Sequence, residues 1–284
     1  LPNWLGDTLM TYPLLVQLDS AGVDFTSFGH PWVSDIFSAT RFSVIGSPQI
    51  REHLHMCRQY RQGSFTHVIL CPSSFSALIP TKLANVSSVG QHFMCSDRVR
   101  QDAERHRVEQ YHDLGQSFFG NDHTKQIPQD FIPLSDLSCQ KAKGVLKAHF
   151  DGPFVVFCPF ATNLHQGQNK EWPHWRHFVS DYRDKPLLGL VASQDVARFK
   201  KEFPGTPVIS ESLSVTAAIM READHVVTND SGAMHLASFF GAQVLGLLGV
   251  TNALETRPWH GHHLTSVEGK WATCRDVINH LSLS

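Results

Sequence analysis

The sequence predicts an α/β fold of doubly wound parallel sheets, and three observations lead to it. Short apolar runs bounded by turn residues alternate with segments of helical periodicity along most of the chain. Within these runs the apolar residues are continuous, which is typical of parallel strands covered on both faces. Hydrophobic residues make up 42% of the chain and charged residues 18%, a balance that suits a folded globular protein. Repeated strand–helix units of this kind build parallel sheets.

The elements follow one another in a regular order. We expect helices at three segments, 173–183, 213–223 and 232–240, the last of them ended by Gly241. We expect buried strands at 65–74, 153–160, 186–193, 225–230 and 242–249. A polar, proline-bearing stretch at about 121–137 separates two such series. Because 284 residues are enough for two domains, we expect one domain over 1–135 and another over 136–284.

The composition excludes several classes of protein. The net charge of -2 argues against broad nucleic-acid binding, which depends on neutralising phosphates. The six cysteines form no C-x-x-C pair, which indicates reduced thiols in a cytoplasmic protein rather than a zinc or disulfide framework. No run approaches the roughly 18 apolar residues of a spanning helix. No G-x-G-x-x-G follows a strand, which argues against a dehydrogenase.

Histidine is in surplus, with 18 copies. His260, His262 and His263 lie together in the segment WHGHH and raise the question of a metal site. No carboxylate or cysteine is spaced around them as a further ligand, so a solvated loop is the simpler interpretation. We expect no metal.

The segment VVTNDSGAMHLASFFG is the most informative one. A buried strand ends at Asn229-Asp230 and a helix starts at Ser231-Gly232, at the edge of the sheet where such folds bind ligands. The helix N-terminus suits a phosphate. We expect the Ser231 side chain to cap the helix and Gly232 to let a ligand approach the backbone closely. We expect His235 to lie near the same edge of the sheet. The residues alone equally allow a plain helix cap with His235 on the surface.

This segment resembles the D-[TS]-G-x-x-H signature of the bacterial heptosyltransferases, the ADP-heptose:lipopolysaccharide glycosyltransferases of family 9. Further stretches resemble motifs of the same family, in the same order, over roughly residues 1–260. They are PNWLGDTLMTYPLL (2–15), VILCPSSFSALIP (68–80), KEWPHWRHF (170–178) and GVTNALETRPW (249–259). The resemblance is closest to the heptosyltransferase II branch. It implies a GT-B fold, in which two Rossmann-like domains face a cleft, the first binding the acceptor and the second the nucleotide sugar.

The resemblance also implies an activity. A hydroxyl of an inner-core, lipid-linked lipopolysaccharide sugar would attack the anomeric carbon of ADP-heptose with inversion, and ADP would leave without the help of a cofactor. Asp7 matches the family's general base; its other interpretation is an acid favoured by a helix dipole. Lys170 matches the lysine that stabilises the leaving diphosphate; its other interpretation is a solvated lysine before a proline-started helix. Thr162, Asp230, Ser231, Gly232 and His235 would bind the nucleotide sugar together with Lys170.

The start of the chain and two other places depart from the family pattern. In the family a first strand runs directly into the Gly6-Asp7 turn, so we expect that strand to precede Leu1 and to be missing here. Phe160 replaces the glycine of the family's P-G-A, and SSFSAL (73–78) lacks a lysine often present there. Arg98 and Arg100, within RVRQDAERHR (98–107), are candidates to bind the anionic acceptor, although a solvated charged helix explains them equally well.

Two other functions stay open at this point. One is a different nucleotide-sugar enzyme on the same fold, such as a 2-epimerase, and the other is a noncatalytic nucleotide-sugar-binding protein. The implied location is the cytoplasm, with peripheral contact to the inner face of the inner membrane as an option. Nucleic acid is not an expected partner.

Overall fold

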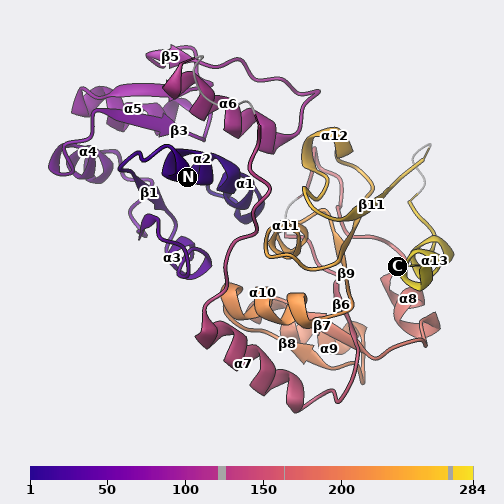
Figure 1. Cartoon of the computed structure of the whole chain (residues 1–284). Helices are drawn as coiled ribbons and strands as arrows, with labels where there is room; N and C mark the ends of the chain where they lie inside the picture. Colours follow the sequence, from indigo (N-terminus) through magenta and orange to yellow (C-terminus); the bar gives the residue numbers. More distant parts are fainter. Residues whose placement is uncertain (121–125, 163, 268–270, 284) are drawn as a thin grey trace. The chain divides into compact units, whose positions relative to one another are not determined.

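The computed structural model describes residues 1–120, 126–162, 164–267 and 271–283. The chain forms two compact units, Leu1–Asp130 and Phe131–Ser284 (Figure 1). The second unit begins before the predicted boundary at 136, because Ile132 donates its N–H to the carbonyl of Phe239 and the Phe131 ring packs on His260. Part of the predicted linker, 121–125, lies outside the described residues.

The first unit contains two parallel sheets, β1–β2 and β3–β4–β5. Its strands are β1 (Thr26–Gly29), β2 (Ser43–Gly46), β3 (His67–Leu70), β4 (Ser87–Gly90) and β5 (Asp97–Arg98). Its helices are α1 (Leu5–Met10), α2 (Tyr12–Ser20), α3 (Val33–Ile36), α4 (His53–Gln62), α5 (Phe75–Ala84) and α6 (Arg107–Phe119).

Local chemistry explains the ends of α5. The Ser74 hydroxyl accepts a hydrogen bond from the N–H of Ala77, which caps the first turn. The helix stops at Asn85, which adopts a left-handed conformation with φ 58°. Asparagine tolerates this conformation better than most residues do. The motif-bearing segment 68–80 therefore contains the end of a strand, a capped turn and the start of a helix, in the order of a strand–helix unit.

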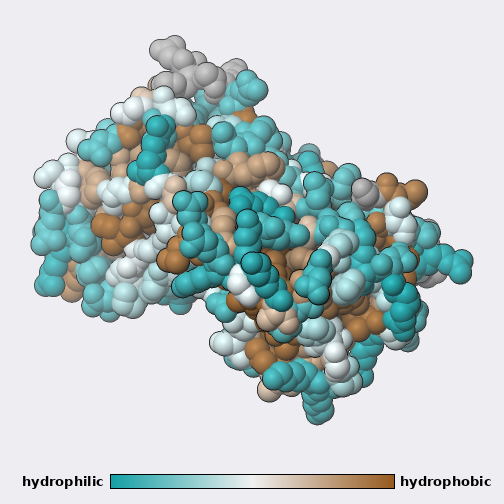
Figure 2. Space-filling model, turned by 60° about the horizontal axis from the view of Figure 1, so that its bottom comes forward, coloured by the Kyte–Doolittle hydropathy of each residue, from teal (hydrophilic) through white to brown (hydrophobic). Residues whose placement is uncertain are grey.

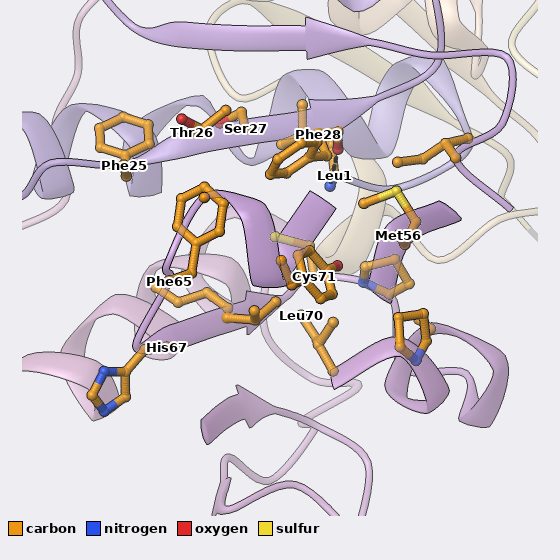
Figure 3. Close-up of a pocket in the computed structure, with 18 of the residues that line it drawn as sticks. Leu1, Phe25, Thr26, Ser27, Phe28, Met56, Phe65, His67, Leu70 and Cys71 are labelled. Atoms are coloured by element: carbon orange, nitrogen blue, oxygen red, sulfur yellow. Dashed lines mark hydrogen bonds between the residues drawn. The ribbon is translucent and has the colours of Figure 1, made fainter. Parts of the chain in front are cut away.

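Strand β3 departs from the prediction for residues 65–74. That run was expected to be buried on both faces, but of the four residues of β3 only Leu70 is buried, Val68 and Ile69 are half-buried, and His67 is exposed. The reason is that β3 pairs with β4 along one edge and with no strand of the described chain along the other. A cavity of about 540 Å³ lies beside this second edge, between β3 and β1 (Figure 3).

The second unit is built on one six-stranded parallel sheet, in the order β11-β10-β9-β6-β7-β8. Its strands are β6 (Val155–Cys158), β7 (Leu187–Leu190), β8 (Val208–Ile209), β9 (His225–Asn229), β10 (Val244–Leu248) and β11 (His262–Thr265). Its helices are α7 (Asp136–Lys147), α8 (Trp175–Asp181), η1 (Ser193–Asp195), α9 (Val196–Glu202), α10 (Leu213–Glu222), α11 (Gly232–Phe239), α12 (Ala253–Thr256) and α13 (Cys274–Leu283). The α/β class and the four strands predicted in this unit are confirmed.

Helices cover both faces of this sheet, as a doubly wound fold requires. Alternate residues such as Val155 and Phe157 point into a core that α8, α9 and α13 close with aromatic and aliphatic side chains. On the other face, α11 lies so close to β10 that a side chain at Gly246 would meet the Met234 sulfur at 2.6 Å. The central strands β6, β9 and β10 are buried along their whole length, which confirms the inference from their continuous apolar residues.

The surface of the molecule mixes polar and apolar areas. On the face drawn in Figure 2, hydrophobic areas lie scattered among hydrophilic ones. No helix in the described part of the chain is both long and apolar enough to cross a membrane.

Candidate nucleotide-sugar site

The candidate site lies where the strand order of the second unit reverses. From β6 the chain moves outward to β7 and β8, and from β9, the neighbour of β6 on the other side, it moves to β10 and β11. In an open parallel sheet, ligands bind outside the carboxyl ends of the strands at such a switch point. The segments that follow β6 and β9 are therefore the ones to examine, and the sequence motifs at Thr162 and at 230–235 fall in them.

Lys170 and Asp230 meet at this edge of the sheet. The Lys170 ammonium nitrogen lies 3.0 Å from Asp230 Oδ2, and the two side chains are 18% and 4% exposed. Asp230 Oδ2 is buried and, among the described residues, has the Lys170 ammonium as its charged partner but no hydrogen bond of ordinary geometry. The interpretation of Lys170 as a solvated lysine is wrong, because its charge balances a buried carboxylate.

Ser231 does not cap α11 with its side chain, which corrects the prediction. Ser231 occupies the N-cap position in an extended conformation, but its own carbonyl accepts the N–H of Met234 at 3.1 Å, and its hydroxyl makes no capping bond. Within the described residues, the buried Ser231 Oγ has no hydrogen-bond partner at all. A buried hydroxyl without a partner is costly, and here it lies at a helix N-terminus beside Asp230 and Gly232.

His235 is buried, with 4% of its surface exposed, and lies on the first turn of α11. The alternative interpretation, in which it is a surface residue, is therefore wrong. Thr162 lies in the loop after β6 and is exposed. Gly232 is the first residue of α11 and is half-buried.

Asn229, the last residue of β9, connects the loops of this site through hydrogen bonds of its side chain. Its amide oxygen accepts hydrogen bonds from the N–H of Trp172 at 2.8 Å and from the indole nitrogen of Trp175 at 3.1 Å. Its amide nitrogen donates to the carbonyls of Pro159 at 2.7 Å and Cys158 at 3.4 Å. One fully buried side chain thus joins the ends of β6 and β9 to the segment that carries Lys170. We did not single out Asn229 from the sequence, although it immediately precedes the Asp-Ser-Gly motif.

These bonds also explain where α8 begins. The segment 170–174 was expected to enter a helix at Pro173, but the helix starts at Trp175. The N–H of Trp172 is committed to Asn229 and its indole nitrogen donates to the carbonyl of Ala272 at 2.8 Å. Pro173 and His174 accordingly form a turn, and His174, with φ -102° and ψ 13°, is the residue just before the helix.

Phe160, the residue that departs from the family pattern, belongs to a second network. The guanidinium carbon of Arg198 lies 3.9 Å from the centre of the Phe160 ring. Arg198 also forms a two-point ion pair with Glu171, at 2.9 and 2.7 Å, and Glu171 Oε1 accepts the N–H of Ala161 at 3.2 Å. The aromatic side chain therefore helps to hold the loop after β6 against the segment that carries Lys170.

Thr251 is a further polar residue at this edge that the sequence analysis did not identify. It follows β10, whose neighbour is β9, and its buried hydroxyl has no hydrogen-bond partner among the described residues. Its place within GVTNALETRPW is the signal that could have pointed to it. Polar residues thus follow each of three neighbouring strands, β6, β9 and β10.

The predicted base, Asp7, lies in the first unit. It occupies the first turn of α1 and is half-buried. The Tyr111 hydroxyl donates to Asp7 Oδ1 at 3.5 Å. Burial and then the charge of Asp7 raise the pKa of Tyr111 well above its usual value, so Tyr111 stays a donor at neutral pH.

Arg98 and Arg100 are both exposed, also in the first unit. They do not lie in a charged helix, which corrects that alternative: Arg98 ends β5, a loop follows, and α6 starts only at Arg107. Arg105 pairs with Glu109 and Asp113 of α6, which fixes it to that helix and removes it from the set of available cations.

The histidines at 260–263 do not form the solvated loop that we expected. His262 and His263 begin β11, and burial lowers the pKa of both His260 and His263. Among the residues described, no group of three or more histidine, cysteine, aspartate or glutamate side chains could hold a metal ion.

A doubly wound unit with a charged pair and unsatisfied hydroxyls at its switch point has the architecture of the Rossmann type. The chain belongs to glycosyltransferase family 9 (heptosyltransferase), whose family model matches residues 53–277. The protein is therefore a glycosyltransferase, and its two α/β units are those of the GT-B fold.

Solved structures of the same fold cover almost the whole chain. E. coli ADP-heptose LPS heptosyltransferase II has a TM-score of 0.81 at 20% identity, over 99% of this chain and 96% of that one. E. coli heptosyltransferase WaaC with ADP has a TM-score of 0.72 at 20% identity, over 98% and 96%. A family 9 glycosyltransferase from Veillonella parvula has a TM-score of 0.78 at 17% identity, over 92% and 82%. Among curated proteins no match was found.

Proposed function

We propose that the protein transfers heptose from ADP-heptose to a sugar hydroxyl of an inner-core lipopolysaccharide acceptor, with inversion at the anomeric carbon. The observation that carries this proposal is the Lys170–Asp230 pair beside the unsatisfied Ser231 hydroxyl, at the switch point of the second unit. The family supports the reaction class. The structures of E. coli WaaC with ADP and with ADP-2-deoxy-2-fluoro heptose support this choice of donor by analogy of fold.

The donor's diphosphate would be held by three kinds of group. Lys170 supplies a cation, Ser231 a hydroxyl donor, and the α11 N-terminus at Gly232 supplies backbone N–H groups. Asp230 keeps the Lys170 ammonium in place before the nucleotide arrives. When ADP leaves, negative charge grows on the diphosphate, and a cation already in position stabilises that charge without reorganisation.

Thr162 and His235 would complete the donor site. Thr162 is an exposed hydroxyl in the loop that the Glu171–Ala161 bond holds beside the Lys170 segment. His235 is a buried side chain on the first turn of the helix whose N-terminus faces the phosphate. Both are proposed to contact the nucleotide sugar.

Asp7 would act as the general base. A single displacement with inversion needs one proton acceptor for the attacking hydroxyl and forms no covalent sugar–enzyme intermediate. The exposed guanidinium groups of Arg98 and Arg100 would attract an anionic, lipid-linked acceptor. The proposed location is accordingly the cytoplasm, in peripheral contact with the inner membrane.

A panel of nucleotide sugars tests the proposal. Each is incubated with the protein, with and without a core-oligosaccharide acceptor, and released nucleotide and modified acceptor are both measured. The proposed function requires ADP release from ADP-heptose that depends on the acceptor, together with an acceptor that gains one heptose. Sugar isomerised without transfer would show an epimerase instead, and nucleotide-sugar binding without turnover would show a binding protein.

A further inference from the structure

Arg198, in the first turn of α9, donates hydrogen bonds from all three nitrogens of its guanidinium group. Nη1 and Nη2 donate to the two carboxylate oxygens of Glu171 at 2.9 and 2.7 Å. Nε donates to Glu202 Oε1 at 2.8 Å. Because every nitrogen already faces a carboxylate, an effect of Arg198 on a bound nucleotide passes through these partners and not through direct contact.

Glu171 is the partner that connects Arg198 to the candidate donor site. Its Oε1 also accepts the N–H of Ala161, the residue before Thr162, at 3.2 Å. It follows Lys170 directly in the chain, and its side chain is only 16% exposed. One carboxylate therefore joins the loop that carries Thr162 to the segment that carries Lys170.

The charge of Glu171 needs to be balanced, because Lys170 lies beside it in the chain. Lys170 pairs with Asp230 at 3.0 Å. Without a counter-charge of its own, the poorly solvated Glu171 carboxylate would compete for the Lys170 ammonium and repel a diphosphate. The paired hydrogen bonds from Arg198 satisfy this carboxylate and offset its charge.

This ion pair differs from an ordinary one at the surface. Arg198 is 44% exposed, and isolated pairs with so exposed an arginine contribute little. Here the pair with Glu171 is bidentate, which fixes direction as well as distance. The guanidinium also stacks on Phe160, whose ring lies 6.3 and 6.4 Å, between ring centres, from those of Phe199 and Phe203. Arg198 is thus held both along its edge and on one face.

We propose that Arg198 is a positioning residue of the donor site and acts through Glu171. Its ion pair fixes Thr162 and Lys170 relative to each other, and it leaves the Lys170 ammonium available to the donor's diphosphate. This step rests on the proposed function, since it takes the nucleotide sugar to bind beside Lys170. It adds a residue from α9, a helix that none of the donor residues named above belongs to.

Arg176 provides a matched control on the same side of the network. It lies in α8, and its guanidinium is 3.8 Å from Glu202, the second carboxylate that Arg198 contacts. Arg176→Gln and Arg198→Gln each remove one positive charge next to Glu202. Arg198→Gln also removes the ion pair of Glu171, so a difference between the two variants reports on Glu171.

Calorimetric titration of ADP into the parent and the variants tests the proposal. We expect Arg198→Gln to bind ADP about tenfold or more weakly than the parent, and Arg176→Gln to bind it within about twofold of the parent. Arg198→Lys keeps the charge but loses the planar fork and should recover only part of the loss. Equal affinity in the parent and Arg198→Gln, or equal losses in Arg198→Gln and Arg176→Gln, overturns the proposal.

The double variant R198Q/E171Q separates positioning from folding. Glutamine at 171 keeps an oxygen that can accept the Ala161 N–H but carries no charge, so the double variant should bind ADP more tightly than R198Q does. Urea unfolding of both variants accompanies the titrations. A double variant that binds no more tightly than R198Q, or a gain in affinity that only follows a gain in stability, contradicts the role of Glu171.

These titrations also distinguish this inference from the proposed function. A parent chain that binds no ADP overturns the proposed function and this inference with it. ADP binding that does not depend on Arg198 overturns the inference alone. ADP binding that depends on Arg198, in a chain that transfers no heptose, supports the inference and contradicts the proposed reaction.

Discussion

The Lys170 ammonium balances the charge of the buried Asp230 carboxylate. A single substitution at either residue therefore affects folding as well as function. Replacing Lys170 with methionine leaves a buried carboxylate without its counter-charge. We expect K170M to lower the free energy of unfolding by about 1–3 kcal/mol, and D230N added to K170M to restore most of the loss. Urea unfolding of the parent, the single variants and the double variant measures this. A single K170M variant as stable as the parent would mean that Asp230 does not need Lys170.

Asn229 offers a second prediction at the scale of one residue. Asn229→Leu removes the partners of the Trp172 N–H, the Trp175 indole and the Pro159 carbonyl at once. We expect a loss of about 2–4 kcal/mol in unfolding free energy and a raised KM for the nucleotide sugar, because the segment of Lys170 loses its anchor.

Trp172→Phe is the matched control for Asn229→Leu. It removes the indole bond to the Ala272 carbonyl but keeps the backbone N–H bonded to Asn229. It should lower stability with little change in KM. If both variants change KM equally, Asn229 has only a structural role and does not position the donor site.

At the scale of elements, the serines at the N-cap positions of α7 and α11 differ in what their hydroxyls do. Ser135 Oγ accepts the N–H of Ser138 at 3.2 Å and caps α7, whereas the Ser231 hydroxyl makes no cap bond. Ser135→Ala should therefore cost about 1 kcal/mol of stability, and Ser231→Ala less than about 0.5 kcal/mol. ADP affinity should show the reverse pattern: it should fall in Ser231→Ala and stay unchanged in Ser135→Ala. A stability loss of equal size in both variants would show that Ser231 is an ordinary cap.

The strands show how much of the fold the sequence could predict. Strands β6, β9 and β10 were predicted because they are central, and residues buried on both faces must be apolar without interruption. β1, β2 and β4 were not predicted, since TSFG, SVIG and SSVG are short and rich in serine and glycine. They become strands through pairing with neighbours, which is not visible in a short window of sequence.

The site was predicted only in part, because contacts between distant segments are not visible in a short window of sequence. The Asp-Ser-Gly motif and Lys170 could be found because each stands in a local pattern. Their meeting at 3.0 Å could not, because 59 residues of chain separate them and only the sheet brings them together. The role of Asn229 depends on contacts with Cys158, Pro159 and Trp172, which are equally distant in sequence.

At the scale of the whole molecule, buried and half-buried histidines predict a loss of stability in mild acid. Burial lowers the pKa of His225, His260, His263 and His280 in the second unit. Below an unfolded value of about 6.5, the unfolded chain therefore binds more protons than the folded one, and stability falls as pH falls. Urea unfolding at pH 7.5 and 5.5 should give the lower free energy at pH 5.5. Equal or greater stability at pH 5.5 would contradict the burial of these rings.

The proposed function requires that the donor's diphosphate binds at the edge of the sheet where Lys170 and Asp230 meet. Calorimetric titration of ADP into the parent and into the K170M/D230N double variant tests this most directly, because the double variant removes one charge of each sign and keeps the net charge. We predict that ADP affinity falls by about tenfold to a hundredfold in the double variant, as for the loss of a hydrogen bond to a charged group. An ADP affinity equal to that of the parent, in a double variant of parental stability, would contradict it.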